Sequence, residues 1–213
     1  MMNQASKQEF VKLLEERKFI KIAELVIQKR GTVRYLKRLL YSTETLLRWR
    51  AIEAMGVVVD KLAESDPEGA RNIIRSLFWS INDESGGIGW SAPECMGEII
   101  YRRPIQFKEF ASIILSFTDE EMLRRGVVWA AGRIAQASPD LVRAAVPEML
   151  AFLSDPDPVL RGYVLRFLFI IGEKLDNRYR HLLDDRSTVP LYEDGVLRET
   201  TVAELAVRLL PEK

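Results

Sequence analysis

A helical repeat is clearest in the stretch Asp155-Pro156-Asp157-Pro158-Val159-Leu160-Arg161, where an acidic turn leads into an aliphatic residue and an arginine. Small and apolar residues follow that arginine. The same order of turn, anchor and apolar segment recurs upstream with anchors at Arg48, Gly89 and Arg124. The four anchors lie about 35 to 41 residues apart, a period typical of stacked helical hairpins.

Each interval between anchors also holds a second apolar segment with helical spacing. Pro67 and Pro139 directly follow Asp66 and Ser138, an order typical of a capped helix start. Strand-like alternation is nearly absent before residue 185. The sequence therefore predicts an all-α fold with first helices over residues 33–41, 67–81, 107–117 and 141–153.

The two ends of the chain depart from the repeat. Residues 6–31 are expected to form an N-terminal capping hairpin of two helices, followed by four helical repeats over 32–175. In the segment 176–213, an Asp194-Gly195 turn between apolar runs predicts a small β-hairpin. Thr201 and Glu204 then match a capping box for a last helix over 202–210. We interpret 1–213 as one domain, with this hairpin and helix as its C-terminal cap. The alternative is that the hairpin serves as a docking strand for a partner.

Two further features fit stacked helices. Small residues let neighbouring helices approach closely, and they recur at Ala51, Ala54, Gly56, Ala130, Ala131 and Gly132. The anchors Arg48, Arg124 and Arg161 predict a polar ladder in which each arginine bonds a nearby acidic turn residue.

Residues 155–161, with Val128-Trp129-Ala130-Ala131-Gly132-Arg133-Ile134-Ala135, resemble HEAT-type repeats, and in particular the type labelled phycobilisome lyase HEAT-like repeat. The resemblance covers about residues 42–175. It implies a right-handed α–α superhelix whose second helices line a concave surface, but it specifies no function, because one fold serves many.

Composition limits the classes of function. The 213 residues carry 31 Lys+Arg and 31 Asp+Glu, and this zero net charge argues against general nucleic-acid binding. With one cysteine, Cys95, no internal disulfide can form, and with one histidine, His181, metal sites built on paired histidines are excluded. No apolar run is long enough to span a membrane, and the N-terminus lacks a signal-peptide pattern. We therefore expect a cytoplasmic protein without metal or cofactor.

The candidate binding residues lie in two rows on the second helices. One row follows each anchor directly, and the other lies four residues later on the same helical face. Both rows mix aromatic and charged residues where a core would be aliphatic, and exposed tryptophans are typical of interaction hot spots. The alternative is that the tryptophans pack between repeats while the glutamates are solvated. The predicted binding residues of these rows, with Glu98 extending the acidic end, are Trp49, Trp90, Arg125, Glu53, Glu94, Trp129, Arg166 and Glu98.

A glycine-rich loop in the second repeat is the other candidate. Three glycines in four positions are costly unless the turn needs them or a ligand approaches the backbone. The loop is interpreted either as an irregular turn or as a contact site, and it adds Asp83, Glu84, Gly86, Gly87 and Gly89 to the predicted binding residues.

No catalytic constellation stands out. Glu94 and Glu98, together with Asp83 and Glu84 of the loop, are only weak evidence for a catalytic carboxylate pair or a divalent-cation site, since they lack the spacing of a calcium loop. Cys95 falls in a small-residue row and is expected in the core, whereas His181 lies in a polar stretch and is expected at the surface. The leading hypothesis is a non-catalytic protein-binding scaffold. The alternatives are a DNA-binding protein or glycosylase-type enzyme, since some alkylpurine DNA glycosylases have HEAT-like repeats, and a relative of bilin lyases.

Overall fold

The computed structural model describes residues 4–81 and 91–211. Its contacts divide the chain into two compact units, Met1–Arg103 and Pro104–Lys213, and each is described by itself. Both units are built mainly from helices, in agreement with the predicted all-α class. None of the described helices is long and apolar enough to cross a bilayer.

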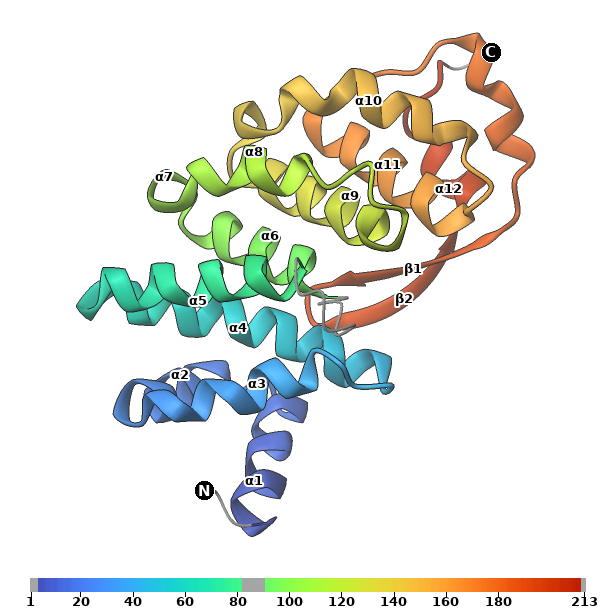
Figure 1. The fold of residues 1–213 in the computed structure, drawn as a ribbon. Coiled ribbons are helices and arrows are strands. Elements are labelled where there is room, and N and C mark those ends of the chain that lie inside the picture. The colour runs from blue at the N-terminus through green and yellow to red at the C-terminus, as the bar shows by residue number, and fades with distance from the viewer. Residues whose placement is uncertain (1–3, 82–90, 212–213) are drawn as a thin grey trace. The chain divides into compact units, whose positions relative to one another are not determined.

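Unit 1 is organised around one long helix. This helix, α4 (Thr45–Ser65), contacts all the other α-helices of the unit (Figure 1). Its apolar residues are buried along nearly its whole length because neighbours cover several of its sides. The remaining elements are α1 (Gln4–Glu15), α2 (Phe19–Gln28), η1 (Arg30–Thr32), α3 (Val33–Leu39), α5 (Pro67–Ile81) and α6 (Ala92–Arg102).

Unit 2 is centred on a pair of second helices, α9 (Glu121–Ala135) and α11 (Pro158–Ile171), which pack against each other (Figure 1). Helix α11 also packs against the C-terminal elements β1 and α12. The remaining elements are α7 (Pro104–Phe107), α8 (Glu109–Leu115), η2 (Pro139–Leu141), η3 (Arg143–Ala145), α10 (Val146–Ala151), η4 (Phe152–Ser154), η5 (Asn177–Asp184), β1 (Thr188–Glu193), β2 (Val196–Thr201) and α12 (Val202–Ala206).

The anchor arginines make one repeated hydrogen bond. Each donates to the backbone carbonyl six residues earlier: Arg48 to Ser42 at 3.1 Å, Arg124 to Thr118 at 2.7 Å and Arg161 to Asp155 at 2.6 Å. The residue before each of these anchors is buried, namely Leu47, Leu123 and Leu160. The first, third and fourth repeats are therefore equivalent in local structure around their anchors. The anchor of the second repeat, Gly89, and Ile88 before it lie outside the described residues.

The predicted arginine ladder is confirmed in unit 2. Arg124 Nη1 lies 3.6 Å from Asp155 Oδ2, and Arg161 bonds Asp185 Oδ2 at 2.5 Å. In unit 1 the described contact of Arg48 is to the Ser42 carbonyl rather than to an acidic side chain.

Helices are present in all four segments predicted to hold a first helix, but the last two of these helices are interrupted. Helix α5 has the predicted bounds, and Asp66 Oδ1 accepts from Gly69 N at 2.8 Å as its cap. Ser138 is the N-cap of η2 and Pro139 its first residue, as predicted, but the Ser138 side chain makes no cap bond. The expected helix over 141–153 is broken, since Val142 leaves the helical region and Pro147 sits at the start of α10. The helix expected over 107–117 is instead two short helices, and the first begins at Pro104, where the fixed φ of proline suits a first turn.

The C-terminal hairpin is confirmed. Strands β1 and β2 are antiparallel, and Glu193 is paired with Val196 across a two-residue turn. Asp194 and Gly195 have φ of 52° and 81°, the positive values that such a turn requires. Thr201 and Glu204 form the predicted capping box, although α12 ends at Ala206, earlier than expected. The hairpin packs on α11 as the predicted cap, with the Tyr163 hydroxyl donating to the Pro190 carbonyl at 3.1 Å.

Candidate functional site

The predicted binding residues fall into three groups. Four lie in unit 1, on α4 and α6, and three lie in unit 2, on α9 and α11. The loop candidates and one row member lie outside the described residues: Asp83, Glu84, Gly86, Gly87, Gly89 and Trp90.

The tryptophans of the two rows are not exposed. Trp49 and Trp129 are 5% and 3% exposed, so the expected hot-spot exposure is wrong for both and the packing alternative holds. Among the three tryptophans that the structure describes, Trp79 on α5 is exposed, at 78%. It follows Asn72 and Arg75 at helical spacing on the solvent face of that helix. This spacing was visible in the sequence, but Trp79 belongs to a first helix and the predicted rows ran along the second helices.

Unit 2 brings two predicted residues together. Arg166 of α11 lies over the ring of Trp129 of α9, with Cζ 5.8 Å from the ring centroid. Its Nε donates to Glu193 Oε1 at 2.8 Å, from the end of β1. A guanidinium held between an indole face and a carboxylate is well stabilised by cation–π and ionic contact. Glu193 was not predicted, because it lies 27 residues away on a different element.

The buried position of Arg166 depends on Gly132. A Cβ at Gly132 would lie 2.7 Å from Arg166 Nη1, so the glycine leaves space for the guanidinium. Arg166 is 5% exposed, and its Nη1 has no hydrogen-bond partner among the described residues. Arg125, one helical turn before Trp129, is instead exposed and bonds Asp157.

Unit 1 contains a comparable arrangement with the charges reversed. Glu98 of α6 is 2% exposed and accepts from Arg102 Nε at 2.9 Å, one turn later on the same helix. A Cβ at Gly56 of α4 would lie 2.5 Å from Glu98 Cγ, so this glycine admits the glutamate. The expectation that the glutamates of the rows are solvated is wrong for Glu98.

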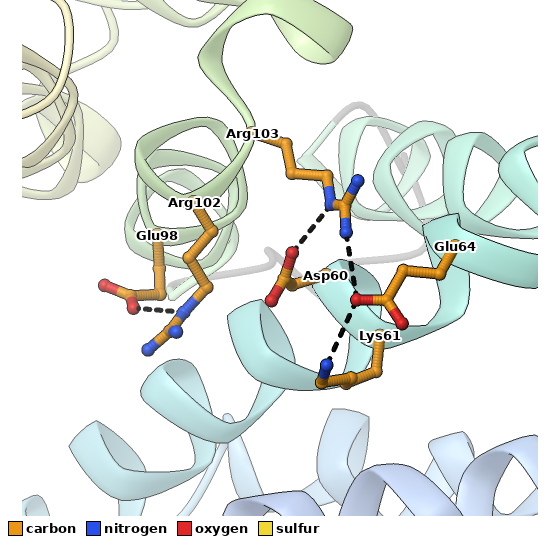
Figure 2. A network of polar contacts seen from close by, with 6 residues as sticks. All are labelled: Asp60, Lys61, Glu64, Glu98, Arg102 and Arg103. Carbon is orange, nitrogen blue, oxygen red and sulfur yellow. Dashed lines mark hydrogen bonds and ion pairs between the residues drawn. The ribbon is translucent and has the colours of Figure 1, made fainter.

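An ion-pair network ties the end of α6 to α4 (Figure 2). Arg103 Nε donates to Asp60 at 2.6 Å, and its Nη2 donates to Glu64 at 3.3 Å. Lys61 bonds the same carboxylate of Glu64 at 3.1 Å. The groups are partly exposed, so we assign the network to helix orientation, with modest contributions from each pair.

The two remaining row glutamates differ in environment. Glu53 accepts from Arg17 at 2.7 Å, a long-range pair that the sequence did not predict. Glu94 is half-buried, and its Oε2 is shielded from solvent with no hydrogen-bond partner in the described part of the chain. Burial raises the pKa of Glu94 to about 7, opposed by its own backbone N–H and by Arg48.

The structure places the one cysteine and the one histidine of the chain where the sequence predicts them. Cys95 is buried as predicted, and burial raises the pKa of its thiol, so the reactive thiolate is disfavoured. His181 is exposed, with Nδ1 3.1 Å from the Arg178 carbonyl, as expected for a surface residue. Over residues 4–81 and 91–211, no cluster of three or more acidic, histidine or cysteine side chains has the geometry to hold a metal.

Comparison with known proteins agrees with the repeat. The family described as HEAT-like repeat matches residues 121–168, which span α9 to α11. An archaeal relative from Archaeoglobus fulgidus, described as an uncharacterized protein, is 29% identical over 176 residues, covering 80% of this chain and 91% of its own length. A HEAT-like repeat is therefore found in unit 2, where the anchor bonds and the arginine ladder are complete.

Proposed function

We propose that this chain is a non-catalytic protein-binding module of the cytoplasm, folded as one right-handed α–α superhelix over 1–213, with its second helices lining a concave recognition surface. The HEAT-like repeat at residues 121–168 supports the class of function, because arrays of such repeats commonly present extended surfaces to protein partners.

The supporting observation is that two residues at the same repeat position hide unsatisfied polar atoms. Glu94 and Arg166 each lie five residues after their anchors, Gly89 and Arg161. Among the described residues, Glu94 Oε2 and Arg166 Nη1 are buried without a hydrogen-bond partner. Leaving a buried polar group unsatisfied costs about 1–3 kcal/mol. Both atoms are shielded from solvent, so a partner reaches them by displacing neighbouring side chains, and one that then supplies the missing bonds would recover that free energy.

The two positions call for opposite groups on the partner. Arg166, stacked on Trp129, suits an acidic side chain that shares the guanidinium with Glu193. Glu94, with its raised pKa, suits a basic or hydrogen-bond-donating group, whose approach would favour the ionised carboxylate.

Affinity purification with quantitative mass spectrometry tests this function. The bait proteins are the wild type, the double variant Glu94→Gln, Arg166→Met, and a control, Arg178→Gln, whose exposed arginine bonds only locally. We expect partners that copurify with the wild type and the control to be depleted at least tenfold with the double variant. Far-ultraviolet circular dichroism confirms that each bait is folded. Equal recovery of the same partners by all three would refute the proposed surface.

A further inference from the structure

Unit 1 contains a small cavity that the proposed binding rows do not use. It measures about 50 Å³ and lies between α3, α5 and the first residues of α6. Its polar lining comes from Lys37 and from three serines, Ser76, Ser80 and Ser91. Since one water requires roughly 10–15 Å³ by this measure, the cavity of about 50 Å³ has room for a group of about three to five heavy atoms.

Among the described residues that line the cavity, Lys37 is the one that carries a charge. The lysine is half-buried, and its Nζ donates to Ser76 Oγ. It makes no ion pair with any carboxylate of the described residues, and burial lowers the pKa of its amine because the charged form loses solvation. Charged groups withdrawn from water are normally paired. The described lining therefore presents a cation without a negative charge to balance it.

The serines complete the polar side of the cavity. Ser76 and Ser80 lie four residues apart on one face of α5, and each hydroxyl donates at 2.6 Å to a carbonyl of its own helix. Hydroxyl hydrogens rotate, so both can turn to donate into the cavity when an acceptor is present. Ser91 is buried at the N-cap of α6, yet its side chain makes no capping bond to that helix.

We propose that this cavity binds a small oxyanion, either a carboxylate or a phosphate group, with Lys37 as its counter-charge and the hydroxyls of Ser76 and Ser80 as hydrogen-bond donors. Leu40 and Leu77 form an apolar part of the lining that excludes water from the ion pair. Tyr41, which lines the cavity and is 52% exposed, marks its solvent side, so a larger molecule carrying the anion can extend outward there.

Titration of the full-length protein with inorganic phosphate and with acetate tests the site. Both titrations are followed by two-dimensional NMR at constant ionic strength with chloride as the balancing anion. The variants are Lys37→Met, Ser76→Ala and a matched control, Lys21→Met, which removes an exposed lysine of α2. We expect saturable shifts at residues 37–41 and 76–80 in the wild type and the control, at least tenfold weaker binding in Lys37→Met, and weaker binding in Ser76→Ala.

The two anions separate the sources of the ligand. Preference for phosphate assigns a phosphorylated ligand, and preference for acetate assigns a carboxylate. Absence of saturable shifts with both anions would overturn the proposal, as would equal binding by wild type and a folded Lys37→Met variant. Replacement of Lys37 by arginine guards against a folding artefact, because it keeps the charge and should retain measurable binding if the anion site is real.

Discussion

Gly56 in unit 1 and Gly132 in unit 2 hold the same place in their repeats, eight residues after Arg48 and Arg124. Each glycine leaves space for an ion pair whose buried member belongs to the next second helix of its unit. In unit 1 the buried member is the carboxylate of Glu98, and its arginine is partly exposed. In unit 2 the buried member is Arg166, and its carboxylate is half-exposed.

The difference shows that the glycine provides space for a buried charged side chain but does not determine whether that charge is negative or positive. A missing Cβ lets a long polar side chain enter the helix interface in both units. The sign of the buried charge then depends on where its partner lies. Arg102 is one turn from Glu98 on the same helix, whereas Glu193 reaches Arg166 only because the C-terminal hairpin packs on α11.

The largest effect is expected from Arg102→Met. This change removes the arginine that pairs with the buried carboxylate of Glu98, and breaking a buried pair typically costs about 3–5 kcal/mol in free energy of unfolding. Urea denaturation at pH 7 measures the loss. The double variant Glu98→Gln, Arg102→Met should regain most of it, since no uncompensated charge remains.

Its counterpart in unit 2 is Glu193→Gln. We expect a smaller loss there, because Arg166 keeps its contact with Trp129 and the removed carboxylate is half-exposed. An equal or larger loss for Glu193→Gln would show that the two arrangements do not differ as their burial indicates.

Glu94 contrasts with Glu98 within unit 1. Glu94 Oε2 is shielded from solvent and has no hydrogen-bond partner among the described residues, whereas Glu98 accepts a hydrogen bond from Arg102. The carboxyl of Glu94 is protonated in both the folded and the unfolded chain below about pH 4.5, and it then contributes nothing to the pH dependence. As pH rises toward the folded pKa of about 7, the unfolded chain releases the proton first, so the free energy of unfolding falls.

The pKa of Glu94 rises from 4.5 to about 7, and each pKa unit corresponds to about 1.36 kcal/mol. Above pH 7 the free energy of unfolding is therefore lowered by up to about 3 kcal/mol. Glu94→Gln should therefore stabilise the protein more at pH 8 than at pH 5. Denaturation midpoints at the two pH values measure the effect, and Glu53→Gln, at a row position paired with Arg17, is the control. A pH-independent effect of Glu94→Gln would contradict the assigned pKa.

The smallest effects are expected at the glycines themselves. Gly56→Ala places a methyl group 2.5 Å from Glu98 Cγ, an atom near the backbone that cannot easily move, and overpacking of this kind costs about 1–3 kcal/mol. Both changes gain about 1 kcal/mol in helix propensity, but Gly132→Ala meets only the end of the flexible Arg166 side chain, so its net loss should be smaller. Thermal unfolding compares the two variants, and a larger loss for Gly132→Ala would reverse the interpretation.

Local features were predictable because their causes lie within a few residues. The Asp194-Gly195 turn needs positive φ at both positions, and the capping box at Thr201 is complete within four residues. The anchor arginines likewise bond a carbonyl six residues earlier, so their equivalence was visible as a sequence repeat. Break points were less predictable: Pro147 stopped one expected helix, but the interruption at Lys108 has no evident breaker in the sequence.

The candidate site was only partly readable from sequence. Spacing placed Trp129 and Arg166 at related repeat positions, and the structure brings them into contact. Spacing did not show that Trp49 and Trp129 are buried while Trp79 is exposed. Helical periodicity shows which residues share one face of a helix, but it does not show whether another element packs on that face.

The sequence by itself determined the all-α class, the register of the repeat anchors and the C-terminal hairpin, because each follows from backbone geometry and hydrogen bonds over short distances. Only the tertiary structure decided which charges are buried and which partners meet them, such as Arg17 with Glu53, Arg166 with Glu193, and Lys37 with Ser76. Those pairs join residues 27 to 39 positions apart, and their free energy depends on burial that exists only after the helices have packed.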